Sequence, residues 1–179
     1  FRVCAARAGQ TALVLAPTFS EYERSVRLFG GEVREYALRR ENGFALTNEF
    51  LNALDDSVDL LFLCNPNNPT GLLIEDSLLD SIIQRCRKHR ILMIVDECFL
   101  EFTRGSSLIP AIAKYDHLLL LRAFTKYYGM AGLRLGYLVG NPALLSRIAP
   151  FGPEWNVSTV AQAAGVAALS EPDWDLRTR

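Results

Sequence analysis

The sequence lacks the features that mark several common protein classes. It has only two histidines, His89 and His117, and its four cysteines form no C-x-x-C pair. Zinc sites are built from clustered cysteine and histidine ligands, so we expect no metal site. Cys64 lies in an apolar run and Cys98 lies near one. This placement predicts reduced, buried thiols in a cytoplasmic protein.

Long hydrophobic runs and an excess of charge of one sign are also absent. No apolar stretch reaches the ~18 residues that a membrane-spanning helix requires. The 19 Lys and Arg residues nearly balance 20 Asp and Glu residues, and the net charge is -1. This balance argues against nucleic acid or a membrane surface as the main partner. Because the chain starts at Phe1 rather than Met, a start signal could have preceded it.

What the sequence does contain is an alternation of short apolar runs and helical patterns. Half of its 179 residues are hydrophobic, enough for one α/β domain with a core. The apolar runs predict strands at Thr11–Ala16, Glu32–Ala37, Val58–Cys64, Ile91–Val95, His117–Leu121 and Leu135–Val139. Helices are expected from Ser20 to Gly30, near Asn48–Leu54, over Glu75–His89, after Asn141 and over Val160–Leu169.

The strands are short and apolar without clean alternation, which is typical of a sheet covered on both faces. We therefore expect a three-layer α/β fold, a mostly parallel sheet with helices on both faces. Some helix ends carry their own signals. Ser20 and Glu23 have the spacing of a capping box, and Gly30 suits a left-handed C-terminal position. Asn141 is a candidate N-cap, with Pro142 at the first helical position.

Polar residues follow four of the predicted strands. These are the segments Pro17–Phe19, Asn65–Gly71, Asp96 and Thr125–Lys126. Ligands bind beyond the carboxyl ends of strands in open α/β sheets, so the four ends could meet at one crevice. Each segment also has a plain structural explanation when taken alone, such as a tight turn, a helix cap or a surface lysine. Only their combination and order argue for a site.

Four segments, in this order, carry a resemblance to a known family. They are NPNNPTG at 65–71, DECF at 96–99, FTK at 124–126 and GLRLGY at 132–137. Together they resemble the fold-type-I pyridoxal-phosphate enzymes related to aspartate aminotransferase, and the eight-residue step from Lys126 to Arg134 matches that family. The resemblance covers nearly the whole chain.

The resemblance also implies what surrounds the chain and its site. Residues 1–179 would form the central part of the large domain that binds pyridoxal 5'-phosphate. An N-terminal arm and a C-terminal small domain, which supplies substrate-binding arginines, would be absent. Family members are dimers with sites at the subunit interface, so a homodimer is expected of the full-length protein.

The resemblance assigns a role to each candidate residue. Lys126 would form the Schiff base with the cofactor and then act as general base or acid at the substrate Cα. Asp96 would keep the pyridine nitrogen protonated so that the ring can accept electrons. Asn68 would donate to the phenolic oxygen of the ring and lie against the substrate. A lysine needs desolvation or a nearby cation to become nucleophilic, and Lys126 follows an apolar strand near two arginines.

Three further residues match positions that hold the cofactor. Thr125 and Arg134 would bind its phosphate, which a hydroxyl and a guanidinium suit, and Phe19 would stack on its ring. Two positions depart from the family pattern. Ala123 replaces a Ser or Thr that would contact the phosphate, and Phe99 replaces a Tyr that would contact the phenolic oxygen.

Within the family, the segments APTFSEYE at 16–23 and ENGF at 41–44 resemble the threonine-phosphate decarboxylase branch of cobalamin biosynthesis, and Phe99 fits that branch. The resemblance implies a lyase that converts a phosphorylated amino acid, L-threonine O-3-phosphate, to 1-amino-2-propanol O-2-phosphate and carbon dioxide. The histidinol-phosphate aminotransferases are the next alternative. A non-catalytic cofactor-binding regulator domain, or an inactive fragment, is a third.

Overall fold

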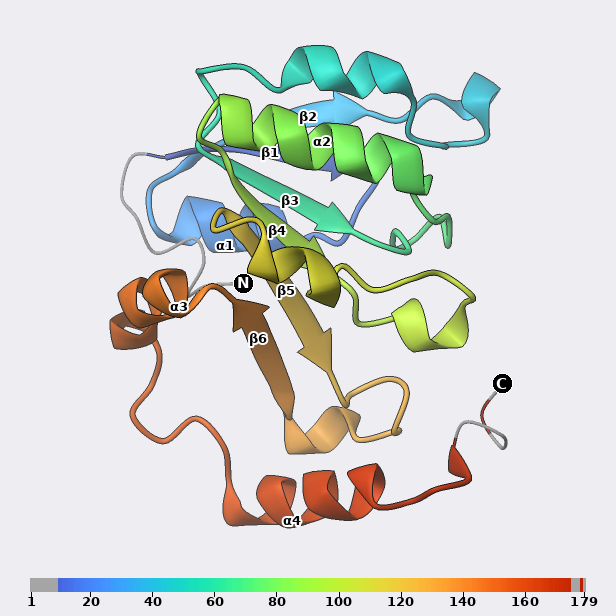
Figure 1. Cartoon of the computed structure of the whole chain (residues 1–179), viewed down its shortest axis with the longest axis vertical. Helices are drawn as coiled ribbons and strands as arrows, with labels where there is room; N and C mark the ends of the chain where they lie inside the picture. The colour runs from blue at the N-terminus through green and yellow to red at the C-terminus, as the bar shows by residue number, and fades with distance from the viewer. Residues whose placement is uncertain (1–9, 175–177, 179) are drawn as a thin grey trace.

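One six-stranded sheet organises the chain (Figure 1). The structure is a computed structural model and describes residues 10–174 and 178. The strands are β1 (Thr11–Ala16), β2 (Glu32–Ala37), β3 (Leu60–Cys64), β4 (Leu92–Asp96), β5 (Leu118–Ala123) and β6 (Gly136–Gly140). They lie in the order β2-β1-β3-β4-β5-β6. All neighbouring pairs are parallel except β5 and β6, which are antiparallel.

Helices cover both faces of the sheet, whereas the last helix of the chain lies beyond the lower end of the sheet in Figure 1. The α-helices are α1 (Glu21–Leu28), α2 (Asp76–Lys88), α3 (Pro142–Ile148) and α4 (Thr159–Leu169). Short 3-10 helices are η1 (Arg40–Asn42), η2 (Asn48–Ala53), η3 (Leu100–Phe102), η4 (Ile109–Ala113), η5 (Ala131–Leu133) and η6 (Ala149–Phe151). In the described part of the chain, no helix is long and apolar enough to cross a membrane.

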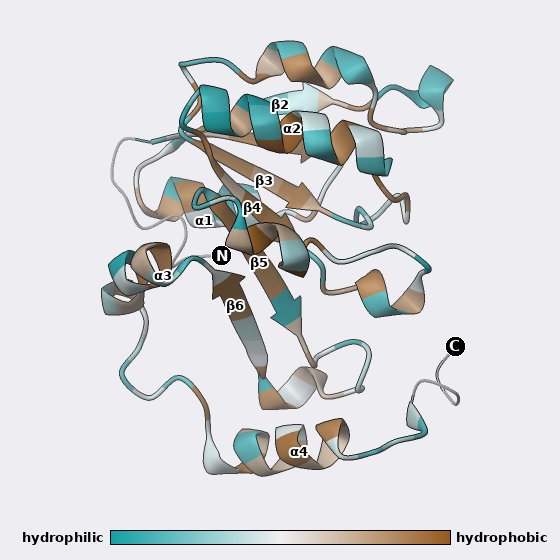
Figure 2. Ribbon diagram, in the orientation of Figure 1, coloured by the Kyte–Doolittle hydropathy of each residue, from teal (hydrophilic) through white to brown (hydrophobic). Residues whose placement is uncertain are grey.

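Side chains from alternate strand positions fill two separate cores. Leu13 and Leu15 of β1 pack on the face covered by α2 and η2, whereas Val14 packs on the face covered by α1 and α3. Figure 2 shows that β3 and β4 are hydrophobic along most of their length, whereas α2 beside them has both hydrophobic and hydrophilic residues. The expectation of a three-layer, mostly parallel α/β fold is confirmed. Both faces of the central strands β1, β3 and β4 are buried, which explains why these strands lack polar–apolar alternation, whereas the edge strand β2 is mostly exposed.

Two of the predicted helix ends are confirmed and one is wrong. Gly30 is left-handed with φ +73°, and the Asn141 side chain accepts from the N–H of Ala143 at 2.9 Å. Ser20, however, makes no side-chain cap, and its φ of -63° and ψ of -20° are already helical. A capping side chain needs an extended backbone at that position, so the predicted capping box does not form.

The cysteines are placed almost as expected. Cys64 and Cys86 are buried free thiols, but Cys98 is only half-buried and lines a pocket. Burial raises the pKa of Cys64 to about 11 and that of Cys86 to about 12, so both thiols stay protonated near neutral pH. Cys4 lies outside the described residues. No group of metal-binding side chains is found among residues 10–174 and 178.

Candidate active site

The predicted site residues lie together in one pocket of about 830 Å³. β1, β3, β4 and β5 are adjacent and parallel, so their carboxyl ends lie at one edge of the sheet. Six predicted residues line the pocket: Phe19, Asn68, Asp96, Thr125, Lys126 and Arg134. The four strand ends therefore meet as expected, and the two departures from the family pattern, Ala123 and Phe99, line the same pocket.

Asp96 is a buried carboxylate held by neutral groups. It ends β4, is 5% exposed, and accepts a hydrogen bond from the Tyr22 hydroxyl at 2.8 Å through Oδ2. Its Oδ1 accepts from the backbone N–H of Cys98 at 3.0 Å. Within residues 10–174 and 178 no cationic side chain forms an ion pair with it. Buried charges are usually paired, so this acid suits a cation brought by a ligand.

The three asparagine side chains of the segment Asn65–Gly71 make different contacts. The Asn65 side chain accepts from the N–H of Ile74 at 2.9 Å. Asn67 accepts from the Thr18 hydroxyl at 2.8 Å and donates to the Pro17 carbonyl and the Thr70 hydroxyl, each at 3.1 Å. Both side chains hold loops together. The Asn68 side chain lines the pocket and makes no hydrogen bond to another described residue.

Lys126 lies in the turn that follows β5, with its amine close to an aromatic ring. Its Nζ is 5.6 Å from the centroid of Phe99, within the range of a cation–π contact. The side chain is nevertheless exposed in the described part of the chain. The expected desolvation of its amine is therefore not supplied by these residues. One expected cation, Arg122, is already paired with acids.

Antiparallel β5 and β6 bring Arg134 back beside the lysine segment. The Phe124 N–H donates to the Leu135 carbonyl at 3.1 Å, and Ala123 pairs with Gly136. This loop is the physical reason for the eight-residue step between Lys126 and Arg134. Arg134 has a left-handed backbone with φ +55°, which non-glycine residues adopt rarely. Its Nη1 donates to the Ala131 carbonyl at 2.9 Å, and the residue is exposed.

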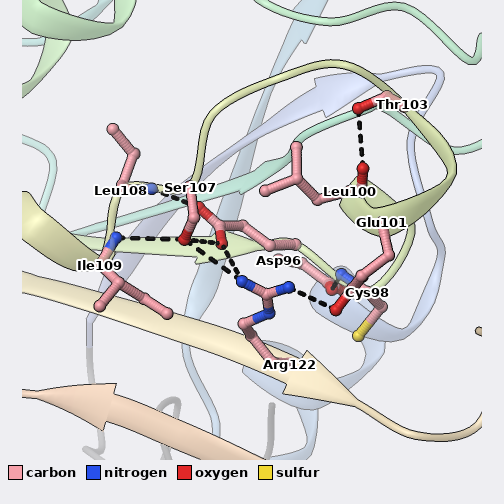
Figure 3. Close-up of polar contacts among 10 residues, drawn as sticks. Asp96, Cys98, Leu100, Glu101, Thr103, Ser107, Leu108, Ile109 and Arg122 are labelled. Atoms are coloured by element: carbon pink, nitrogen blue, oxygen red, sulfur yellow. Dashed lines mark hydrogen bonds and ion pairs between the residues drawn. The ribbon is translucent and has the colours of Figure 1, made fainter. Parts of the chain in front are cut away.

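A buried charged network lies beside the pocket and was not predicted (Figure 3). Arg122 reaches from β5 to Glu97 at 3.3 Å and also pairs with Glu101. Glu97 is 1% exposed and accepts from the Ser107 hydroxyl at 2.6 Å and the Leu108 N–H at 2.8 Å. Burial raises the pKa of the Glu97 carboxyl despite these partners. The only signal in the sequence was a second acid directly after Asp96.

The donor set of the pocket fits pyridoxal phosphate. The buried Asp96 suits a protonated ring nitrogen, and Asn68 offers an amide with no hydrogen bond to another described residue. Lys126 supplies an amine, while the Arg134 guanidinium and the Thr125 hydroxyl suit a phosphate. Phe19 offers an aromatic face on the same pocket. The sequence identified these residues, but it did not identify Tyr22, which fixes the acid.

Comparison with known proteins agrees with this geometry. The sequence profile of "Aminotransferase class I and II" matches residues 1–177. The chain is 40% identical to a threonine-phosphate decarboxylase of Salmonella typhimurium over 99% of its own length and 50% of that protein. It is 36% identical to a histidinol-phosphate aminotransferase of a Geobacillus species over 89% of its length and 44% of that protein. The chain thus spans about half the length of these curated relatives.

Solved structures share the same fold. The histidinol-phosphate aminotransferase from Clostridium acetobutylicum superposes with a TM-score of 0.90 at 26% identity, covering 99% of this chain and 53% of that one. The L-threonine-O-3-phosphate decarboxylase from Porphyromonas gingivalis gives 0.81 at 27% identity, covering 99% and 55%. On its sequence, fold and pocket, the chain belongs to the class I and II aminotransferase family of pyridoxal-phosphate-dependent enzymes.

Proposed function

We propose that the full-length protein is a pyridoxal-phosphate-dependent decarboxylase of L-threonine O-3-phosphate, releasing 1-amino-2-propanol O-2-phosphate and carbon dioxide. The observation that carries this proposal is the 40% identity to a threonine-phosphate decarboxylase across 99% of the chain. The pocket supports it with a complete set of cofactor-type donors at the ends of adjacent parallel strands.

Each pocket residue has a defined task in this proposal. Bound pyridoxal phosphate supplies an electron sink for the electron pair left at the substrate Cα. Asp96 holds a proton at the ring nitrogen, and Asn68 donates to the phenolic oxygen and lies against the substrate. The Lys126 amine binds the cofactor aldehyde and moves a proton at Cα. Thr125 and Arg134 hold the phosphate, and Phe19 covers one ring face.

A histidinol-phosphate aminotransferase is the second candidate function. The identity to such an enzyme, 36% over 89% of the chain, lies close to that of the decarboxylase. The two solved structures reverse the order, with TM-scores of 0.90 for the aminotransferase and 0.81 for the decarboxylase. The proposal follows the higher sequence identity because side chains, not backbone shape, select the substrate.

The reaction catalysed by the full-length protein decides between the two. We expect carbon dioxide from threonine phosphate, and no glutamate when histidinol phosphate and 2-oxoglutarate are supplied. Lys126→Ala should abolish the activity. Lys114→Ala, which changes an exposed lysine after η4, should leave it unchanged. Glutamate formation without carbon dioxide would replace the proposed function with the aminotransferase.

We also propose a cytoplasmic homodimer in which this chain is the central part of the large domain. An N-terminal arm and a C-terminal small domain would complete each subunit. The family membership and the half-length coverage of the relatives support this arrangement. Light scattering of the full-length protein after size-exclusion chromatography tests it: we expect twice the subunit mass, and a monomer would contradict the proposal.

A further inference from the structure

Tyr22 is a buried residue of the pocket that the cofactor roles described above leave unused. It lies near the start of α1, is 0% exposed, and lines the pocket with Asp96 and Phe19. Its hydroxyl donates to Asp96 Oδ2 at 2.8 Å. The two residues are 74 positions apart in the sequence, so the fold itself brings them together.

The ring of Tyr22 is fixed by two aromatic neighbours. It stacks on Phe62 of β3 with centroids 5.3 Å apart and an interplanar angle of 10°. It meets Phe19 edge-on, with centroids 5.6 Å apart at 82°. Both arrangements are favourable for aromatic pairs. One side chain thus contacts both the acid proposed to face the ring nitrogen and the aromatic residue proposed to cover one face of the ring.

The hydroxyl of Tyr22 remains a donor at all working pH values. Burial and the Asp96 carboxylate raise the pKa of Tyr22 far above its ordinary value, because both disfavour the phenolate. Other titratable groups also face Asp96 among the described residues: Cys64 from β3 and Cys98 from the segment after β4. The pKa values of both thiols are raised, by burial first and then by Asp96, so they are neutral.

We propose that Tyr22 is a positioning residue that holds the Asp96 carboxyl group facing the cofactor ring nitrogen and keeps Phe19 against the ring. This inference rests on the proposed cofactor site. The Tyr22 hydroxyl and the Cys98 N–H each hold one oxygen of the Asp96 carboxyl group. Without the Tyr22 donor, this group would be held less firmly against the ring nitrogen. The electron-accepting power of the ring would then fall, although Tyr22 touches neither substrate nor reacting atoms.

The test compares Tyr22→Phe with Tyr36→Phe in the full-length protein. Tyr36 of β2 also makes an edge-on contact, with Phe50, but packs in the core on the other face of the sheet. Pyridoxal phosphate is titrated into the apoprotein, and the folded fraction is checked by circular dichroism. We expect the dissociation constant to rise about tenfold in Tyr22→Phe, because Asp96 loses one of the hydrogen bonds that hold it in place. We expect no change for Tyr36→Phe.

A second readout follows the visible band of the cofactor-loaded protein against pH. The pH at which this band titrates should rise in Tyr22→Phe, because a ring nitrogen that loses its proton withdraws less charge. 3-Fluorotyrosine at position 22 keeps the size of the side chain and makes a stronger donor, so the midpoint should fall. If Tyr22→Phe does not fold, the titration midpoint of the 3-fluorotyrosine variant tests the same role of Tyr22.

The outcomes separate the inference from the proposed function. Wild-type protein that binds cofactor on Lys126, with unchanged affinity and midpoint in both position-22 variants, would overturn the role of Tyr22 alone. Wild-type protein that does not bind the cofactor would overturn both. An equal loss of affinity in Tyr36→Phe would mean a general effect of core tyrosines, and would also contradict the inference.

Discussion

The backbone N–H of Asn65 donates to the backbone carbonyl of Asp96 at 2.9 Å, which joins the segment Asn65–Gly71 directly to the acid. β3 and β4 are paired in parallel up to Cys64 and Asp96, the last residue of each strand. The two most distinctive motifs of the sequence therefore leave the sheet side by side. Their separation of about thirty residues is the length of one βαβ unit.

Asn68 and its neighbour Asn67 should respond differently to removal of their amides. Asn68→Ala should weaken cofactor binding about fivefold, the value of one neutral hydrogen bond, and leave stability unchanged. Asn67→Ala removes contacts to Thr18, Pro17 and Thr70, and should lower the free energy of unfolding by about 1–3 kcal/mol. Urea unfolding and cofactor titration of both variants measure this. A loss of stability in Asn68→Ala together with weaker cofactor binding in Asn67→Ala would contradict this assignment.

The Arg122–Glu97 pair should matter far more for stability than a surface pair. Arg122→Met leaves Glu97 buried without its cation, which should cost about 3–5 kcal/mol. Arg24→Ala removes an exposed pair with Glu21 and should cost less than about 1 kcal/mol. Denaturant unfolding of the two variants gives both values. A cost for Arg122→Met as small as that for Arg24→Ala would show that Glu97 is not held by this pair.

The raised pKa of Glu97 gives a pH dependence with a definite sign. Burial favours its protonated form in the folded state, so its contribution to stability is largest below the ordinary value of 4.5. This contribution is lost as the pH rises from that value through the raised pKa of the folded state. The free energy of unfolding of the wild type should thus fall relative to Glu97→Gln over this range. A relative rise would mean that its partners outweigh burial.

Ala123→Ser should tighten cofactor binding. Ala123 ends β5 and lines the pocket, and a serine there would supply the phosphate contact that the family pattern includes. A hydrogen bond to a charged group contributes about 1.5–3 kcal/mol, so the dissociation constant should fall at least about tenfold. Titration of the apoprotein measures it, with Ala123→Gly as the control for backbone effects. Unchanged affinity would mean that other groups already saturate that phosphate oxygen.

Sequence patterns predicted the strands of the mostly parallel sheet and the polar residues at its carboxyl edge, but not the order of the strands. β1 and β2 begin and end at the expected residues, and the other strands differ by a few positions. A short continuous apolar run predicts a strand that is buried on both faces, and this signal lies entirely in the local sequence. The predicted cap at Ser20 does not form because the Ser20 backbone is itself in a helical conformation. That conformation is not specified by the capping-box residues alone.

Long-range side-chain contacts could not be read from the sequence. The Tyr22–Asp96 hydrogen bond joins residues 74 positions apart, and the Arg122–Glu97 pair joins residues 25 apart. Neither pair has a periodicity or a local motif, because its geometry exists only once the strands are aligned. The same holds for Asn68, which the structure distinguishes from Asn65 and Asn67 by its place on the pocket.

The central claim is that Lys126 holds the cofactor, and borohydride reduction followed by peptide mapping tests it most directly. Full-length protein is loaded with pyridoxal phosphate, reduced, digested and analysed by mass spectrometry. The account predicts a yellow protein before reduction and one modified lysine, in the peptide that contains Lys126. A label on another lysine, or no visible band in the presence of the cofactor, would contradict it.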